Sequence, residues 1–92
     1  MGGGLKMNKK VYLIKWEESY ESGLYSSGIN YVFDTLEKAK TMLEKIKQDI
    51  IDNSEREDIK ELIHNFIYDE GFKVDYLDND YDSYEIVEME VQ

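Results

Sequence analysis

Acidic and aromatic side chains alternate through the last quarter of the chain. Residues 69–90 hold nine Asp and Glu and a single Lys, interrupted by four aromatic residues. Alternate side chains of a strand lie about 6.5–7 Å apart on one face, so a row of carboxylates there suits a basic groove that holds phosphates. Tyrosine rings can stack where bases stack. The pattern predicts a nucleic-acid-like surface with the partner-binding residues Asp75, Asp78, Asp80, Asp82, Glu85 and Glu88, and with Tyr76 and Tyr81 as anchors.

The same carboxylates fit two plainer interpretations. Acidic side chains on an edge hairpin keep it soluble and block sheet-to-sheet aggregation. Asp78, Asp80 and Asp82 match the opening of a calcium-binding EF-hand loop. The match then fails, because that loop needs Gly and Glu where this chain has Ser83 and Met89. We therefore expect a turn rich in Asp and Asn, and no metal site.

Residues suited to catalysis are scarce. His64 is the only histidine, and the absence of cysteine excludes thiolate zinc sites, cysteine nucleophiles and disulfide bonds. No phosphate-binding glycine loop and no serine nucleophile motif occurs. A pair of catalytic carboxylates needs a cleft, which a chain of 92 residues hardly provides. We predict a binding protein without enzymatic activity or cofactor, and a solvent-facing His64 without a catalytic role.

The charge distribution restricts the class of partner. The formal charge is −10, with fourteen acids and three basic residues in 52–92, and with four lysines and no acid in 1–16. This field repels nucleic acid and anionic membranes, and it favours a basic protein surface such as that of a nuclease. No apolar run reaches the roughly 18–20 residues of a membrane span, and no apolar signal segment opens the chain. Without cysteines for disulfides, we expect a cytoplasmic protein.

Alternating β-branched and aromatic residues predict four strands. Residues 11–18 (VYLIKWEE) are apolar on both faces, which indicates a central strand. Residues 29–33 follow a turn-rich connection and are expected to pair antiparallel with that strand. Residues 72–77 and 84–91 are the other two strands, with residues 78–83 as their turn.

Two stretches have the periodicity of amphipathic helices. The first spans residues 35–51 with Asp34 as its N-cap. Its apolar stripe comprises Leu36, Ala39, Met42, Leu43, Ile46 and Ile50. The second begins at a capping box formed by Ser54 and Glu57 and ends before Gly71, which is expected in the left-handed conformation. Its apolar stripe comprises Ile59, Leu62, Ile63, Phe66 and Ile67.

These elements predict an α+β fold. We expect an antiparallel sheet of about four strands in the order β-β-α-α-β-β, with both helices packed on one face. One domain covers residues 9–92, and residues 1–8 are expected to form a disordered tail.

Three phrases resemble short proteins of phages and mobile elements. They are KKVYLIKWEE at 9–18, YVFDTLEKAKTMLEKI at 31–46 and SYEIVEMEV at 83–91. The small size and the acidity are also similar to those of anti-CRISPR and anti-restriction proteins. The resemblance implies an anti-defence protein in the host cytoplasm. It would inhibit a host nucleic-acid-binding enzyme through its acidic face and would not bind nucleic acid itself.

Two other function classes stay open. A protein–protein adaptor or homo-oligomer would bind through apolar contacts that salt does not weaken, for example at Tyr20, Leu24 and Tyr25 in the first long connection. A small-ligand binder would need a pocket lined by lysines from the chain start or from the first helix.

Overall fold

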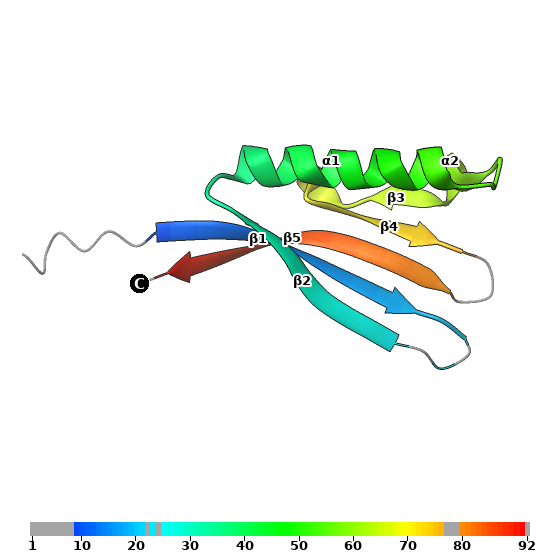
Figure 1. The fold of residues 1–92 in the computed structure, drawn as a ribbon, viewed down its shortest axis with the longest axis horizontal. Helices are drawn as coiled ribbons and strands as arrows, with labels where there is room; N and C mark the ends of the chain where they lie inside the picture. The colour runs from blue at the N-terminus through cyan, green and yellow to red at the C-terminus, as the bar shows by residue number, and fades with distance from the viewer. Residues whose placement is uncertain (1–8, 22, 24, 77–79, 92) are drawn as a thin grey trace, which may run out of the picture.

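The computed structural model describes residues 9–21, 23, 25–76 and 80–91 (Figure 1). Within them, five antiparallel strands form one sheet in the order β2-β1-β5-β4-β3. The strands are β1 (Lys9–Ser19), β2 (Tyr25–Phe33), β3 (Ile63–Asn65), β4 (Gly71–Asp75) and β5 (Tyr81–Val91). The helices are α1 (Leu36–Asn53), the single turn α2 (Ile59–Leu62) and the 3-10 turn η2 (Ile67–Asp69). The predicted α+β class is confirmed, with α1 as the main helix on one face of the sheet.

β1 is an interior strand, as its two apolar faces predicted. It pairs antiparallel with β2 on one side and with β5 on the other. The β1–β5 register runs without a break from Lys9 opposite Val91 to Ser19 opposite Tyr81. β5 therefore starts inside the predicted turn, because residues 81–83 pair with both β1 and β4. The predicted tail over residues 1–8 lies outside the described residues.

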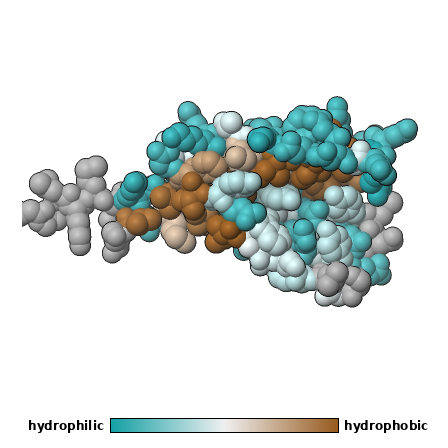
Figure 2. Space-filling view, viewed as in Figure 1, coloured by the Kyte–Doolittle hydropathy of each residue, from teal (hydrophilic) through white to brown (hydrophobic). Residues whose placement is uncertain are grey.

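α1 packs its predicted apolar stripe on the sheet. Ala39 and Leu43 are buried, and the half-buried residues of α1 that contact the core are Met42, Ile46, Ile50 and Ile51. The buried cluster under them consists of Ile14, Leu43, Ile59, Phe72 and Val74. Burial of one such side chain contributes roughly 1.5–3 kcal/mol. The outer face of α1 is hydrophilic (Figure 2), so this helix buries one stripe only.

The N-cap of α1 lies one residue beyond the predicted position. Thr35 has extended backbone angles, and its Oγ1 accepts a hydrogen bond from the Lys38 backbone N–H at 3.2 Å. Asp34 accepts instead from Lys38 Nζ at 2.9 Å. This hydrogen bond is the main cause that lowers the pKa of the Asp34 carboxyl. Asp34 thus stabilises the start of the helix from outside the cap.

The predicted second helix is wrong. Ser54 is the C-cap of α1, and its Oγ accepts the Arg56 backbone N–H at 3.1 Å instead of capping a new helix. Only the single turn α2 forms, and Ile63–Asn65 then pair with β4 as β3. The strand pairing satisfies backbone groups along the outer edge of β4. A helix in this segment would leave that edge without a neighbour, so tertiary pairing overrides the helical periodicity.

The residues predicted as the apolar stripe of the second helix do not share one environment. Ile59 is buried, whereas Phe66 and Ile67 are exposed. Gly71 does not end a helix but begins β4. A Cβ at Gly71 would overlap the Phe66 ring and lie 2.8 Å from the Tyr84 carbonyl oxygen. Close backbone approach, and not a left-handed conformation, is therefore what requires this glycine.

β2 carries one extra residue. Leu13 pairs with Val32 and Ile14 pairs with Asn30, so Tyr31 has no partner on β1. Tyr31 has φ 64°, in the left-handed region, which costs a residue with a side chain roughly 1–2 kcal/mol. A bulge of this kind increases the twist of an edge strand.

No helix in the described ranges is long and apolar enough to cross a membrane.

Trp16 lies flat on β2. It pairs with Gly28 across the ladder, and a Cβ at Gly28 would lie 2.9 Å from the ring atoms Cζ2 and Nε1. Real Cβ atoms do not approach other atoms so closely, so any larger residue displaces the indole ring. Trp16 is the only tryptophan of the chain, and its fluorescence reports on this contact alone.

We expect Gly28→Ala to lower the free energy of unfolding by about 1–2 kcal/mol, because overpacking outweighs the entropy gained from a Cβ. The Trp16 emission should shift to the red as the ring moves into water. Urea unfolding followed by fluorescence measures both. Ser27→Ala, at the next residue of β2, is the control and should change neither. A Gly28→Ala variant as stable as the parent would contradict this packing.

Candidate interaction surfaces

The register assigns every strand residue to one of two faces. Directly paired residues share a face, and neighbours along a strand alternate. Ile14 pairs with Ile86, and both contact the core under α1. Residues such as Leu13, Lys15 and Val87 therefore lie on the opposite face. We call this uncovered side the open face.

The predicted acidic residues do not form one row. Asp75, Tyr81 and Glu85 lie on the open face, whereas Asp82 and Glu88 lie on the face that α1 covers. Tyr76 is half-buried and packs against the core. Asp80 precedes β5 and lies in no strand, and Asp78 lies outside the described residues.

Two of these carboxylates hold the β1–β2 connection to β5. Asp80 Oδ1 accepts the Glu21 backbone N–H at 2.6 Å. Asp82 Oδ1 accepts the Tyr20 hydroxyl at 2.9 Å. Tyr20, one of the possible contact residues in the first long connection, thus has a structural role, and so do two of the predicted binding acids. Sequence spacing did not reveal these contacts, because they join segments about sixty residues apart.

Burial and negative charge favour the neutral form of Tyr20. Burial is the main cause that raises its pKa, followed by the hydrogen bond to Asp82 and by the charges of Asp82 and Glu18. Glu18 pairs directly with Asp82 across β1 and β5. Like charges in directly opposed positions repel each other. The end of the sheet near the β1–β2 connection, which we call the hairpin end, therefore concentrates carboxylates.

Two of the other candidates, Glu88 and Tyr81, have a cation beside them. Glu88 forms an ion pair with Lys10 at 2.8 Å. Lys73 Nζ lies 4.5 Å from the centre of the Tyr81 ring, and the Tyr81 hydroxyl donates to Glu17 Oε2 at 3.4 Å. These contacts neutralise part of the acidity that the sequence pattern predicted for a binding surface.

The open face carries a cluster of aliphatic side chains that the sequence interpretation missed. We call it the aliphatic patch, and it consists of Val11, Leu13, Ile29, Val32, Val87, Met89 and Val91. Leu13 lies at its centre and is only 6% exposed, although it is not part of the core cluster under α1. Around it, Ile29 is 56% and Val32 63% exposed. Figure 2 shows hydrophobic side chains gathered where β1 begins and β5 ends.

A signal for this patch was present in the sequence. The segment 11–18 is apolar on both faces, but the chain supplies helices for only one layer. One apolar face of β1 therefore had to stay without a cover. The contribution of Ile29 and Val32 was not foreseeable, because the extra residue Tyr31 changes which face each residue of β2 occupies.

The open face is also the neutral part of an acidic protein. Its described charged residues are Lys9, Lys15, Lys73, Glu17, Asp75 and Glu85. Three lysines thus balance three acids, whereas the whole chain carries −10. His64 lies on the same face in β3, exposed as predicted but on a strand and not on a helix.

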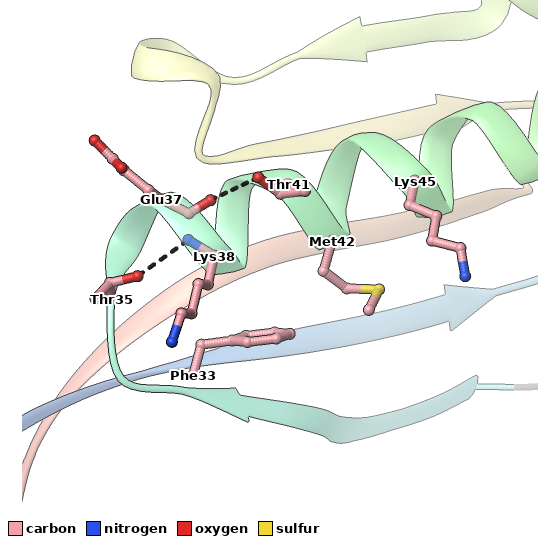
Figure 3. A pocket seen from close by; sticks show the side chains of 7 residues that line it. All are labelled: Phe33, Thr35, Glu37, Lys38, Thr41, Met42 and Lys45. Atoms are coloured by element: carbon pink, nitrogen blue, oxygen red, sulfur yellow. Dashed lines mark hydrogen bonds between the residues drawn. The ribbon is translucent and has the colours of Figure 1, made fainter.

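A hollow of about 600 Å³ lies between the start of α1 and the end of β2 (Figure 3). Met42 and Lys45 extend from α1 toward the strands, and the Phe33 ring lies below Lys38 and Met42. Two of the polar groups here have partners: Lys38 binds Asp34, and the Thr41 hydroxyl donates to the Glu37 carbonyl at 3.0 Å. Phe33 and Met42 supply apolar surface in the hollow, which suits an apolar side chain.

The part of the chain that the structure describes contains no cluster of three or more His, Asp or Glu that could hold a metal ion.

The Tyr20–Asp82 contact predicts how stability depends on pH. The raised pKa means that the folded state favours the neutral hydroxyl, so its contribution is complete below about pH 10 and is lost as pH rises further. We expect Tyr20→Phe to cost about 1 kcal/mol at neutral pH. The variant should also lose stability less steeply above pH 10 than the parent does.

Urea unfolding at neutral and alkaline pH measures both effects. Tyr25→Phe is the control, because its side chain is exposed, and it should match the parent at neutral pH. If the free energy of unfolding falls equally steeply above pH 10 in the parent and in Tyr20→Phe, the result argues against the contact. The variant should still lose some stability as pH rises above 10, because burial also raises the pKa of Tyr76 and Tyr84.

Comparison with protein-family models, with curated proteins and with solved structures found no match to this chain. The similarity to short phage proteins therefore stays a prediction, and the surfaces above are interpreted from their own geometry.

Proposed function

We propose that this chain is a protein-binding domain without enzymatic activity, and that its partner covers the aliphatic patch on the open face. The observation that carries the proposal is the charge distribution. A chain of net charge −10 keeps one face neutral, and the exposed aliphatic side chains of its sheet gather on that face. Exposed apolar patches bordered by polar residues are typical of protein interaction sites.

The energetics of the patch support a contact that salt does not weaken. Val32, Ile29, Met89 and Val91 are each about half exposed or more, and burial of apolar area contributes roughly 25 cal/mol per Å². Hydrophobic contacts are not screened by ions, unlike contacts between exposed charges. A salt-insensitive contact is what the adaptor or homo-oligomer alternative of the sequence analysis requires.

We expect Val32→Lys to reduce binding of the partner by more than tenfold, because the interface would bury an unpaired charge. Val32 is 63% exposed, so the fold itself tolerates lysine. The measurement is affinity capture by the tagged chain at about 0.1 and 0.5 M NaCl, quantified by mass spectrometry. Ile67→Lys is the matched control, because Ile67 is 77% exposed but belongs to η2 and is not part of the aliphatic patch. Equal capture by both variants would reject the open face.

A second candidate function is the inhibition of a host nucleic-acid-binding enzyme by the hairpin end. The observation in its favour is the direct opposition of Glu18 and Asp82, with Asp80 and Glu21 in contact beside them. Repulsion within such a group is relieved when a basic partner binds. This candidate keeps the predicted anti-defence role in the host cytoplasm but moves its centre from the predicted acidic row at residues 75–88 to the hairpin end.

Asp80 and Asp82 are unsuitable for charge reversal, because their hydrogen bonds hold the β1–β2 connection. We expect the double variant Glu18→Lys, Asp75→Lys to abolish capture of a basic enzyme at about 0.1 M NaCl. The parent should lose the enzyme at about 0.5 M NaCl. The control is Glu37→Lys, Asp49→Lys, which makes the same change in net charge on α1. Equal loss in both double variants would reject a specific acidic site.

A further inference from the structure

We infer that the hollow between α1 and β2 binds a small carboxylate with an apolar body, whose charge is held by Lys45 and whose body lies on Phe33. The inference goes beyond the proposed protein-binding role, because this hollow lies on the side of the sheet that α1 covers and not on the open face. Its volume of about 600 Å³ is within the range of about 300–1,000 Å³ that small-molecule sites have. A pocket lined by lysines of the first helix is also what a small-ligand binder of this sequence requires.

The apolar walls of the hollow are held in position by the core. Phe33 and Met42 both pack against the buried cluster under α1. In Figure 3 they approach the space from opposite sides, Met42 from the helix and Phe33 from the end of β2. An apolar body can therefore lie between them, and the Phe33 ring offers a surface for aromatic stacking.

A strained residue of β2 extends the aromatic wall. The Tyr31 and Phe33 rings are stacked, with centroids 6.2 Å apart and planes at 24°. Tyr31 has φ 64°, a conformation that few residues with a side chain adopt. Strain of this kind collects at ligand-binding sites, where the surrounding structure enforces it. The bulge thus places a second aromatic ring, 51% exposed for Tyr31 as a whole, beside the hollow.

Lys45 is placed to receive the carboxylate. Figure 3 shows Lys45 extending from α1 toward the strands, whereas the Glu37 carboxylate is directed away from the hollow. Lys45 takes part in none of the ion pairs found among the described residues. A hydrogen bond between an ammonium and a carboxylate is stronger than one between neutral groups. The charge of the ligand therefore contributes to its affinity in addition to the apolar contact.

Lys38 adds positive charge nearer the start of α1. It forms an ion pair with Asp34 at 2.9 Å, but both side chains are more than half exposed, so the pair is weak. The hydrogen bond to Lys38 is the main cause that lowers the pKa of the Asp34 carboxyl, and the charge of Lys9 also lowers it. Two lysines thus act on one carboxylate, which leaves an excess of positive charge at this end of the hollow.

A second hollow in the described part of the chain has the opposite charge. It measures about 690 Å³, lies beside η2, and is lined by Phe66 and Ile67 together with the acids Glu70 and Glu85. The described residues that line it include no lysine or arginine. An apolar body fits either hollow, so the charge of its head group should decide which one it enters.

The test is a series of three probes that share one apolar body and differ in charge: phenylbutyrate, phenylbutanol and phenylbutylammonium. Each is added to the isotope-labelled chain at neutral pH in about 0.1 M NaCl, and the backbone amides are followed by NMR. We expect phenylbutyrate to shift the amides of residues 33–45 with a dissociation constant of about 1 mM or lower, as its size allows. The alcohol should bind at least about threefold more weakly, and the ammonium probe should leave these amides unshifted.

Substitutions on α1 test the role of the lysine. Lys45→Gln should weaken phenylbutyrate binding about three- to tenfold, and Lys45→Glu should abolish it. Lys40→Gln is the matched control, because it makes the same change in net charge on the same helix, about 140° around the axis from Lys45. It should bind phenylbutyrate like the parent. Raising NaCl from about 0.1 to 0.5 M should weaken binding of the acid but not of the alcohol.

Three results would each overturn the inference. The first is that the amides around the hollow do not shift at about 5 mM phenylbutyrate. The second is equal binding of the acid and the alcohol, which would leave the hollow as a contact for an apolar side chain of a protein. The third is an equal loss of binding in Lys45→Gln and Lys40→Gln, which would make the net charge of the chain responsible. Circular dichroism of each variant confirms that the chain remains folded. None of these measurements involves the open face, so their outcome is independent of the proposed function.

Discussion

The uninterrupted pairing of β1 with β5 is the interaction on which the rest of the structure depends. These two strands lie far apart in sequence, yet they form the middle of the sheet and the longest ladder in it. The β2 hairpin attaches to the outer side of β1, and β4 with β3 attaches to the outer side of β5. The core residues Ile14 and Ile86 meet in this ladder, so α1 has a flat apolar surface to pack on only after the ladder forms.

The second constraint is the mismatch between the sheet and its helical cover. One helix of 18 residues packs on a sheet of five strands, and the short turn α2 covers only the area beside β4. A small domain already has little apolar area to bury. A chain without a partner therefore loses stabilisation by leaving the seven residues of the aliphatic patch on the uncovered face. This loss is the physical reason for proposing that the open face binds a partner. Two of the acidic residues, Asp80 and Asp82, serve the internal contacts of the hairpin end.

Local patterns predicted the local elements well. The alternation in 11–18, the periodicity of α1 and the antiparallel β1–β2 pair all follow from side-chain spacing along one segment. Prediction failed where distant segments compete for the same residues. Ile63–Asn65 have helical spacing but pair with β4, and Asp82 matches an exposed binding row but accepts a hydrogen bond from Tyr20. The faces of β2 depend on the extra residue Tyr31, which no pattern in that strand indicates. The candidate site was missed because it is assembled from three strands.

The central position of β5 has a consequence for synthesis on the ribosome. Every other described element is translated before this strand, so a nascent chain that ends before Tyr81 contains two separate strand pairs, β1 with β2 and β3 with β4. In that state the facing edges of β1 and β4 have no neighbour, and α1 has no continuous sheet beneath it. Native topology can be completed only after β5 leaves the exit tunnel, and contacts of such long sequence separation form slowly. The half-built chain is thus the stage at which holdase chaperones are most needed, and at which strand exchange between neighbouring nascent chains competes with folding.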